Sequence, residues 1–150
     1  MFLSQKCQYA VRSIFELTKH YGEGPVKIAD IARAQAIPAR FLEVILSELR
    51  QGGFVESKRG AEGGYFLAHD SSSITVGDII RFVEGPLGPV GCLTDAAPRE
   101  KCPLHENCVF TGLWERAREA MSAVYDATSF KDLVEDEAQM GKRFVPSYTI

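Results

Sequence analysis

Two short helical patterns followed by a glycine-rich hairpin pattern, all within residues 28–68, most constrain the fold of this chain. Apolar residues recur at three- and four-residue intervals over 28–36 and 39–51, which predicts two helices joined by a tight connection that ends at Pro38. Two short apolar segments then flank the loop 60–64, which contains three glycines and predicts a β-hairpin. Two helices around a tight connection, followed by a hairpin, are typical of a winged helix-turn-helix.

The second helix of this pair has one apolar and one polar face. The face that we expect to be buried carries Phe41, Leu42, Ile45, Leu46 and Leu49. The outer side carries Ala39, Arg40, Glu43, Ser47 and Arg50. Gly52-Gly53 predicts the end of the helix.

The remaining sequence predicts further helices on both sides of this unit. Apolar spacing predicts a helix over 4–21, and Thr75-x-x-Asp78 has the form of a capping box ahead of another short helix. We therefore expect a mainly α fold with a small β-hairpin: a winged helix-turn-helix domain with a long C-terminal dimerisation helix. The expected parts are a DNA-binding domain over 1–84, a cysteine-containing loop over 85–108, the dimerisation helix over 109–128, and a short helix, capped by Ser129-x-x-Asp132, with a flexible tail over 129–150.

Composition and charge restrict the class of protein without identifying it. Apolar residues make up 45% of the 150 residues, as in an ordinary globular protein, and no apolar run is long enough to span a membrane. The first residues lack the layout of a secretory signal, so we expect a cytoplasmic protein with no membrane partner. The net charge of −3 divides into +2 over 1–68 and −5 over 69–150, which allows the first half to face a polyanion.

Several short phrases, in the same order along nearly the whole chain, resemble the winged-helix regulators of the Rrf2 family, which includes the IscR, NsrR and CymR types. They are Leu3-Ser4-x-Lys6, Tyr9-Ala10-Val11-Arg12, Gly24-Pro25-Val26, Asp30-Ile31-Ala32, Phe41-Leu42-Glu43, Gly60-x-x-Gly63-Gly64-Tyr65, Ile74-Thr75-Val76-Gly77-Asp78-Ile79-Ile80, and Cys108 followed by Leu113-Trp114. The resemblance implies homodimers that bind palindromic operators in double-stranded DNA. It also implies, as in many members, an iron–sulfur cluster held by three cysteines.

The expected DNA surface combines the outer helix face with the hairpin loop, or wing. Arg40 could donate two hydrogen bonds to guanine, and Glu43 could accept one from cytosine. Arg59, at the base of the wing, is expected in a minor groove, and the neighbouring glycines allow close approach to the backbone. The full expected set is Lys27, Ala39, Arg40, Glu43, Ser47, Lys58, Arg59, Gly63 and Gly64, with Lys6 as a further phosphate contact. The alternative is an ordinary solvated helix and hairpin turn.

Three cysteines with the spacing Cys92-x9-Cys102-x5-Cys108 are the candidate ligands of a [2Fe–2S] or [4Fe–4S] cluster. Zinc fits this spacing less well, because structural zinc sites have cysteine pairs two to four residues apart. The fourth ligand is open between Cys7 of the other subunit, His105 and a non-protein ligand. The resemblance implies a histidine three residues after the third cysteine in some members, and that position is Thr111 here. Cys7 has the spacing of a small buried hydrophobe. Incidental thiols or a thiol–disulfide switch remain the alternatives.

The helix after the cysteine loop carries the expected dimerisation residues Leu113, Trp114, Ala117, Met121 and Val124. Together these features predict a homodimeric regulator that represses or activates genes according to the state of its cluster. The alternatives are a regulator of the same fold that responds through thiols or a partner protein, and a redox or cluster-carrier protein without a DNA role. The sequence contains no nucleophile–base pair, phosphate-cradling loop or catalytic metal motif, so an enzyme is not expected.

Overall fold

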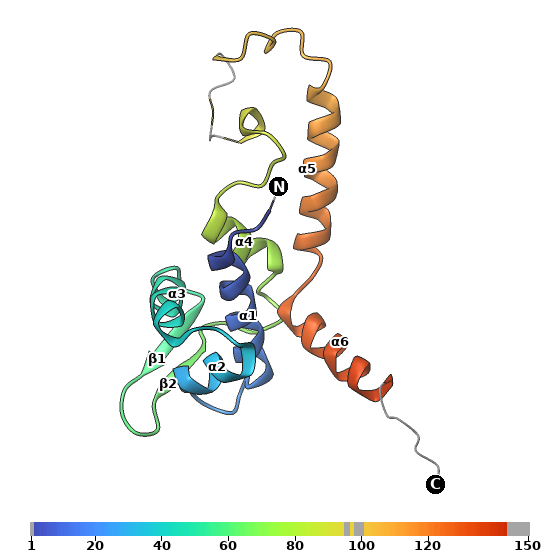
Figure 1. Ribbon diagram of the computed structural model, residues 1–150. Coiled ribbons are helices and arrows are strands. Elements are labelled where there is room, and N and C mark those ends of the chain that lie inside the picture. The colour runs from blue at the N-terminus through green and yellow to red at the C-terminus, as the bar shows by residue number, and fades with distance from the viewer. Residues whose placement is uncertain (1, 95–96, 98–100, 144–150) are drawn as a thin grey trace.

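The computed structural model describes residues 2–94, 97 and 101–143 and contains a helical head from which a long helix projects (Figure 1). The elements are α1 (Gln5–Lys19), α2 (Ile28–Gln35), α3 (Ala39–Gln51), β1 (Val55–Lys58), β2 (Gly64–Leu67), α4 (Val76–Glu84), the 3₁₀ turn η1 (Gly91–Leu93), α5 (Thr111–Asp126) and α6 (Phe130–Arg143). Elements α1 to α4 and the hairpin form the head.

Helices α2 and α3 form the helix-turn-helix, because only the three residues 36–38 connect them. Ala36 caps α2 in the left-handed conformation with φ of 50°, and its amide donates to carbonyls of the last turn of α2. Pro38 then precedes α3, where its lack of an amide hydrogen costs no hydrogen bond. The connection therefore holds α3 at a fixed angle to α2.

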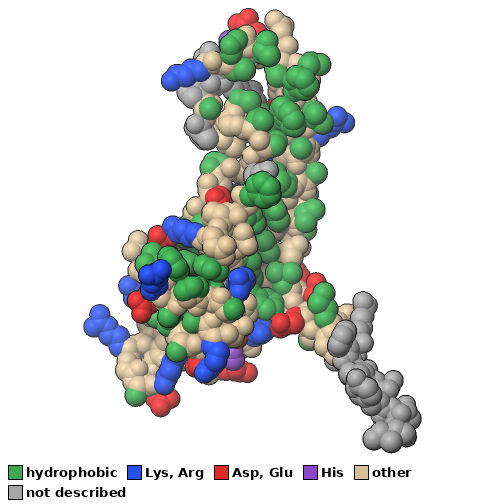
Figure 2. All heavy atoms as spheres, in the orientation of Figure 1, with side chains coloured by type: hydrophobic (Ala, Val, Ile, Leu, Met, Phe, Trp, Pro, Cys, Tyr) green, Lys and Arg blue, Asp and Glu red, His purple; other side chains and the backbone are tan. Residues whose placement is uncertain are grey.

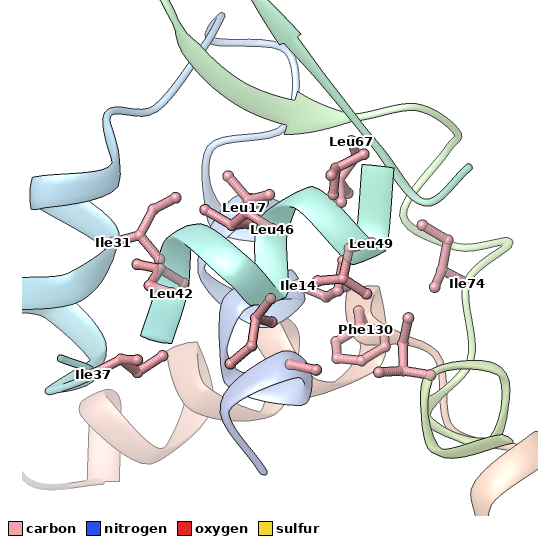
Figure 3. Packing of buried hydrophobic residues seen from close by; sticks show 14 residues of the cluster. Ile14, Leu17, Ile31, Ile37, Leu42, Leu46, Leu49, Leu67, Ile74 and Phe130 are labelled. Atoms are coloured by element: carbon pink, nitrogen blue, oxygen red, sulfur yellow. The ribbon is translucent and has the colours of Figure 1, made fainter. Parts of the chain in front are cut away.

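The hydrophobic core lies between α1, α3, the hairpin and the start of α6 (Figure 3). On α3 it takes up Leu42, Ile45, Leu46 and Leu49, as the apolar spacing predicts. Phe41 differs from expectation, because 47% of it is exposed at the edge of the helix. Phe130 at the start of α6 is fully buried in the same core, so the C-terminal part of the chain helps to close the head.

The wing is a two-stranded antiparallel hairpin in which Val55 pairs with Leu67 and Lys58 pairs with Gly64. Its second strand also pairs with the segment before α2, where the amides of Val26 and Tyr65 each donate to the other's carbonyl over 2.8 Å. This additional bridge fixes the base of the wing against the helix-turn-helix.

Helix α4 begins with the predicted capping box, in which Thr75 and Asp78 exchange hydrogen bonds between side chain and backbone. The residues before α4 also pair with the turn between α5 and α6, through an isolated bridge between Thr75 and Ser129. Ser129 and Asp132 cap α6, which runs for 14 residues and is longer than the short helix expected there. The end of the expected tail, 144–150, lies outside the described residues.

Helix α5 runs away from the head and has no buried residue in this single chain. Its far end carries the cysteine-containing segment, and hydrophobic side chains line this projection (Figures 1 and 2). Near the head, α5 is tied to α4 by an ion pair of 2.6 Å between Arg81 and Asp126. No helix among the described residues is long and apolar enough to cross a membrane.

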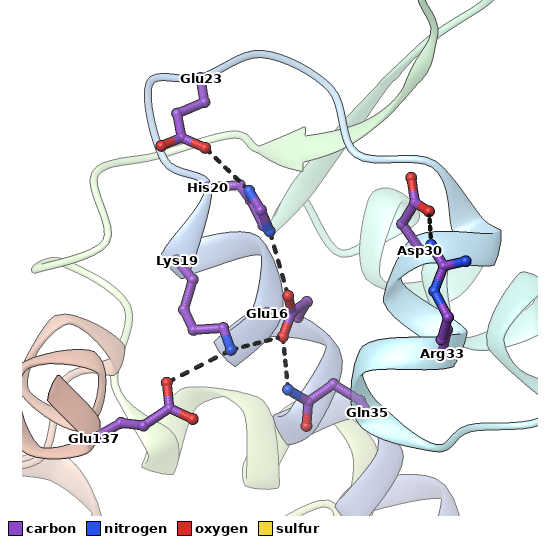
Figure 4. A network of polar contacts seen from close by, with 8 residues as sticks. All are labelled: Glu16, Lys19, His20, Glu23, Asp30, Arg33, Gln35 and Glu137. Atoms are coloured by element: carbon purple, nitrogen blue, oxygen red, sulfur yellow. Dashed lines mark hydrogen bonds and ion pairs between the residues drawn. The ribbon is translucent and has the colours of Figure 1, made fainter. Parts of the chain in front are cut away.

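A polar network joins α1, α2 and α6 (Figure 4). Its centre is Glu16, which is only 4% exposed and accepts a hydrogen bond of 2.7 Å from Gln35 of α2. Lys19 lies 3.2 Å from Glu16 and 3.5 Å from Glu137 of α6. Burial opposes ionisation of Glu16, but the hydrogen bonds from Gln35 and Lys19 outweigh it, and the pKa lies below its ordinary value. The carboxylate therefore holds three helices together in its charged form.

Candidate nucleic-acid interface and cysteine loop

The outer face of α3 presents Ala39, Arg40 and Glu43 to solvent and leaves Ser47 half-buried. The Arg40 guanidinium lies over the Phe41 ring, 4.7 Å from its centre, so its stem is steadied by an exposed aromatic side chain. Ala39, Arg40 and Glu43 thus share one accessible surface at the start of the helix, and Ser47 lies on the same side further along. The structure gives them a common orientation, while their contacts with bases remain a prediction.

Two polar contacts fix α3 relative to its neighbours. Lys6 of α1 lies 2.6 Å from Glu48, and Arg50 donates a hydrogen bond of 2.9 Å to Ser57 of the wing. Both pairs lie at the surface, so each contributes at most about 1 kcal/mol, and their effect is mainly to set geometry. The expected phosphate contact of Lys6 therefore competes with an ion pair inside the protein.

Wing residues Lys58 and Arg59 are exposed, as is Lys27 beside the base of the hairpin. Close contacts inside the protein require glycine at both Gly63 and Gly64, a constraint that the sequence did not reveal. A Cβ on Gly63, which is buried, would lie 2.2 Å from the Lys58 carbonyl oxygen, and one on Gly64 would lie 2.3 Å from the Val26 oxygen. The glycines are needed to close the hairpin and to seat it on the segment before α2, and their contact with DNA remains a prediction.

Cys7 is buried in a small second core with Ile80 and Leu87. Burial, together with the charge of Glu84 and a hydrogen bond to it, raises the pKa of the Cys7 thiol from 9.0 to about 11. A metal ligand must be deprotonated and reachable, and this thiol is neither in the described conformation. The structure thus agrees with the interpretation of Cys7 as a small buried hydrophobe.

The three cysteines of the loop have more open surroundings. Cys92 in η1, Cys102 and Cys108 are all half-buried, and none of the four cysteines, all of which are described, is in a disulfide. Hydrogen bonds from the Thr111 hydroxyl and the Phe110 amide lower the pKa of Cys108 below its ordinary value. Thr111 therefore stabilises the thiolate of Cys108.

The three loop cysteines are the right type of ligand for an iron–sulfur cluster, but the structure does not bring them together. Three thiols in one irregular segment are the right ligands, yet within residues 2–94, 97 and 101–143 no three His, Cys, Asp or Glu side chains come together as a metal site. His105 is exposed, and its Nδ1 lies 3.1 Å from the Cys102 carbonyl oxygen. The loop as described would have to rearrange before these groups could hold a common metal centre.

The expected dimerisation residues lie on α5, and their side chains are exposed or half-buried. Leu113 and Val124 are 46% and 65% exposed, Ala117 is exposed, and Trp114 and Met121 are half-buried. Spacings of four, four and three residues place Leu113, Ala117, Met121 and Val124 on one face of the helix. A second copy of this chain is the predicted cover for this face.

Sequence patterns missed the groups that connect the parts of the site. Arg50, Arg81 and Glu16 each contact residues of other elements, and no local spacing reveals such contacts. The exposure of Val44 on α3 was also missed, although its position one turn after Arg40 was a usable signal.

Comparison with known proteins gives consistent matches over nearly the whole chain. The sequence profile of the Rrf2 family, described as iron-dependent transcriptional regulators, matches residues 3–136. The HTH-type transcriptional regulator CymR of Bacillus subtilis is 39% identical over 145 residues, which cover 93% of this chain and 98% of CymR.

Solved structures agree with the sequence matches. The structure of B. subtilis CymR, called the global cysteine regulator, superposes with a TM-score of 0.74 at 38% identity and covers 90% of this chain and 97% of its own. That of T. potens IscR has a TM-score of 0.74 at 36% identity, with 93% and 91% covered. An oxidised form of Staphylococcus aureus CymR gives 0.68 at 32% identity, with 90% and 97% covered. The expected mainly helical winged helix-turn-helix fold with C-terminal helices is confirmed.

Proposed function

The chain belongs to the Rrf2 family of transcriptional regulators, and from this premise we propose that it binds palindromic operators as a homodimer. It is a DNA-binding regulator and not an enzyme. The observation that carries the proposal is the shared exposure of Arg40 and Glu43 on α3, together with an exposed wing arginine, Arg59. The Arg50–Ser57 hydrogen bond sets the position of the wing relative to α3, so that both can engage one duplex.

Quantitative gel shifts on the region upstream of the protein's own coding sequence test this assignment. We expect Arg59→Ala and Arg40→Ala to weaken operator binding by about 1–3 kcal/mol each at fixed salt concentration. Lys131→Ala, which removes one exposed charge from α6, is the matched control and should bind as the wild type does. Unchanged affinity in both arginine variants would refute this DNA surface.

Dimerisation through α5 is the second part of the proposal. The exposed apolar face of α5 supports it, because an uncovered face of this kind on a projecting helix is typical of an interface. Leu113→Asp combined with Val124→Asp should convert a dimer to monomers in sedimentation equilibrium. Glu119→Gln, on the same helix, is the control. A variant that stays dimeric would place the interface elsewhere.

The third part concerns the signal. We propose that the cysteine loop is the sensory element and that Cys92, Cys102 and Cys108 hold an iron–sulfur cluster once the loop brings them together. The three thiols and the family's description as iron-dependent support this. His105 is better suited than Cys7 as a fourth ligand, because Cys7 is fully buried.

Residues of this chain can transmit a change in the loop to the head. Arg118, in the middle of α5, donates a hydrogen bond of 3.2 Å to the Leu93 carbonyl at the end of η1, and Asp126 at the C-terminal end of α5 pairs with Arg81 of α4. A change in the order of the loop would therefore act on α5 and, through it, on the orientation of the head.

Thiol chemistry without a metal is the second candidate, and the lowered pKa of Cys108 favours it. An oxidised form is also named for a relative, S. aureus CymR. Anaerobic purification followed by iron and sulfide analysis separates the two candidates. Bound iron that is lost in Cys92→Ala, Cys102→Ala and Cys108→Ala would support the cluster. An iron-free protein whose operator binding changes on oxidation would support the thiol switch.

A further inference from the structure

Helix α3 exposes two large apolar side chains that the proposed contacts do not use. Phe41 is 47% exposed and Val44 is 57% exposed, although both lie in the helix that is proposed to read the operator. Figure 2 shows a hydrophobic patch over α3 with lysine and arginine side chains around it. Exposed apolar groups that lie together on a recognition helix are suited to contact an apolar group of the ligand.

The helical position of Val44 assigns it to the outward face. Each residue of an α-helix turns by about 100°, so Val44 lies about 40° around the axis from Arg40 and one turn further along. Leu42, Ile45 and Leu49 are buried on the opposite side. Val44 is therefore no further from the centre of the exposed face than Glu43 is.

The surroundings of Val44 form a shallow groove between α1 and α3. Its volume is about 390 Å³, and Gln5, Lys6, Tyr9, Phe41, Val44, Ile45 and Glu48 line it. Arg40 stacks on Phe41 and Lys6 pairs with Glu48, so cationic groups border the apolar surface. Val44 lies one turn from Arg40 on the same face, so a protein bound over this face would compete with DNA for the helix.

We infer that Val44, flanked by Phe41, contacts the C5-methyl group of a thymine in each operator half-site, next to the base pair that faces Arg40. The inference rests on the proposed operator binding. The thymine methyl is the apolar group that the major groove offers, and small aliphatic side chains are suited to it. Val44 thus determines specificity at one base pair. A polar residue at the same position would instead form a hydrogen bond with a base edge.

Removing single methyl groups from the DNA tests the inference. Duplexes are first selected by the wild-type protein from a randomised library, and each thymine of the enriched half-site is then replaced by deoxyuridine, which lacks only the methyl. At one thymine position we expect wild-type binding to weaken about fourfold for each half-site that is substituted, the effect of losing contact with one methyl-sized apolar group. Val44→Ala should bind the thymine and deoxyuridine duplexes equally.

Two further variants keep the outcome interpretable. Val109→Ala removes the same groups from a valine that is 84% exposed between the cysteine loop and α5, and it should retain the full methyl effect. Val44→Thr keeps one γ-methyl group and should retain part of it. Circular dichroism and sedimentation establish that each variant folds and dimerises as the wild type does.

Several results would overturn the inference. They are an enriched half-site without thymine, a deoxyuridine effect that is absent at every position, and an effect that persists undiminished in Val44→Ala. Loss of dimerisation in Val44→Ala, with the methyl effect intact, would identify the patch as a protein contact instead. Failure to enrich any duplex would refute the proposed function itself, whereas an enriched operator without a methyl effect refutes this inference alone.

Discussion

The contrast between Cys7 and the loop cysteines predicts a large difference in thiol reactivity. The thiolate is the reactive form, and the pKa of Cys7 is raised from 9.0 to about 11. At pH 8, about one Cys7 side chain in a thousand is ionised, against about one in ten for a thiol with the ordinary value. Ionisation alone therefore slows Cys7 about a hundredfold, and its complete burial slows it further because the protein must open first.

Pulsed alkylation measures this difference residue by residue. Reduced protein is treated with EDTA, labelled with iodoacetamide for increasing times, unfolded, and labelled again with an isotopically heavy reagent before peptide mass analysis. We expect Cys108 to react first, because hydrogen bonds from Thr111 and Phe110 lower its pKa. Cys7 should acquire mainly the heavy label.

A variant supplies the control and an opposite outcome the refutation. Cys7→Ala should remove only the slow phase and leave the fast phases unchanged. If Cys7 is labelled as fast as Cys102, the thiol is accessible and ionised, the account of its burial is wrong, and Cys7 returns as a candidate ligand across the dimer.

Three further predictions concern stability. Because the pKa of Glu16 is lowered in the folded state, its network contributes stability at neutral pH, and this stability is lost as the pH falls through the lowered pKa. Gln35→Ala should therefore lower the free energy of unfolding in urea by about 1–3 kcal/mol at pH 7, and by less in acid. Gly64→Ala should lower the free energy of unfolding by about 1–3 kcal/mol and weaken DNA binding, because the added Cβ would clash with the Val26 carbonyl. Gly141→Ala in α6 is the control, because a Cβ there has no neighbour within 4 Å and should not destabilise the protein. Asp126→Ala should lower the free energy of unfolding by less than about 1 kcal/mol, because Asp126 and its partner Arg81 are both more than a third exposed. This loss should shrink in high salt, and a larger loss that salt leaves unchanged would contradict a screened ion pair.

Local chemistry explains which features could be predicted from the sequence. The capping box of Thr75 and Asp78 and the glycine-rich hairpin depend on residues a few positions apart, so their patterns are complete in the sequence. Burial of Cys7 follows from helical spacing in the same way. Phe41 was placed wrongly because it lies at the boundary between the two faces of α3, where spacing cannot distinguish burial from exposure.

Features that join distant segments were beyond sequence reasoning. The bridge between Thr75 and Ser129 and the hydrogen bond between Glu16 and Gln35 depend on how the elements pack. The length of α6 was underestimated because its buried anchor, Phe130, packs into the core of the head rather than against a neighbour in sequence. The arrangement of the cysteine loop likewise depends on contacts with α5, such as that of Arg118 with Leu93.

The attachment of α5 at its C-terminal end makes this helix a lever. With 16 residues it is about 24 Å long, and the turn that follows it is fixed to the head by the Thr75–Ser129 bridge. A tilt of about 5° about that pivot displaces the far end by about 2 Å, an amount comparable to the sliding of packed helices in regulatory transitions. In the opposite direction, a small movement of the cysteines at the tip corresponds to a slight rotation at the head, so chemistry at the far end of α5 can change the orientation of the helix-turn-helix.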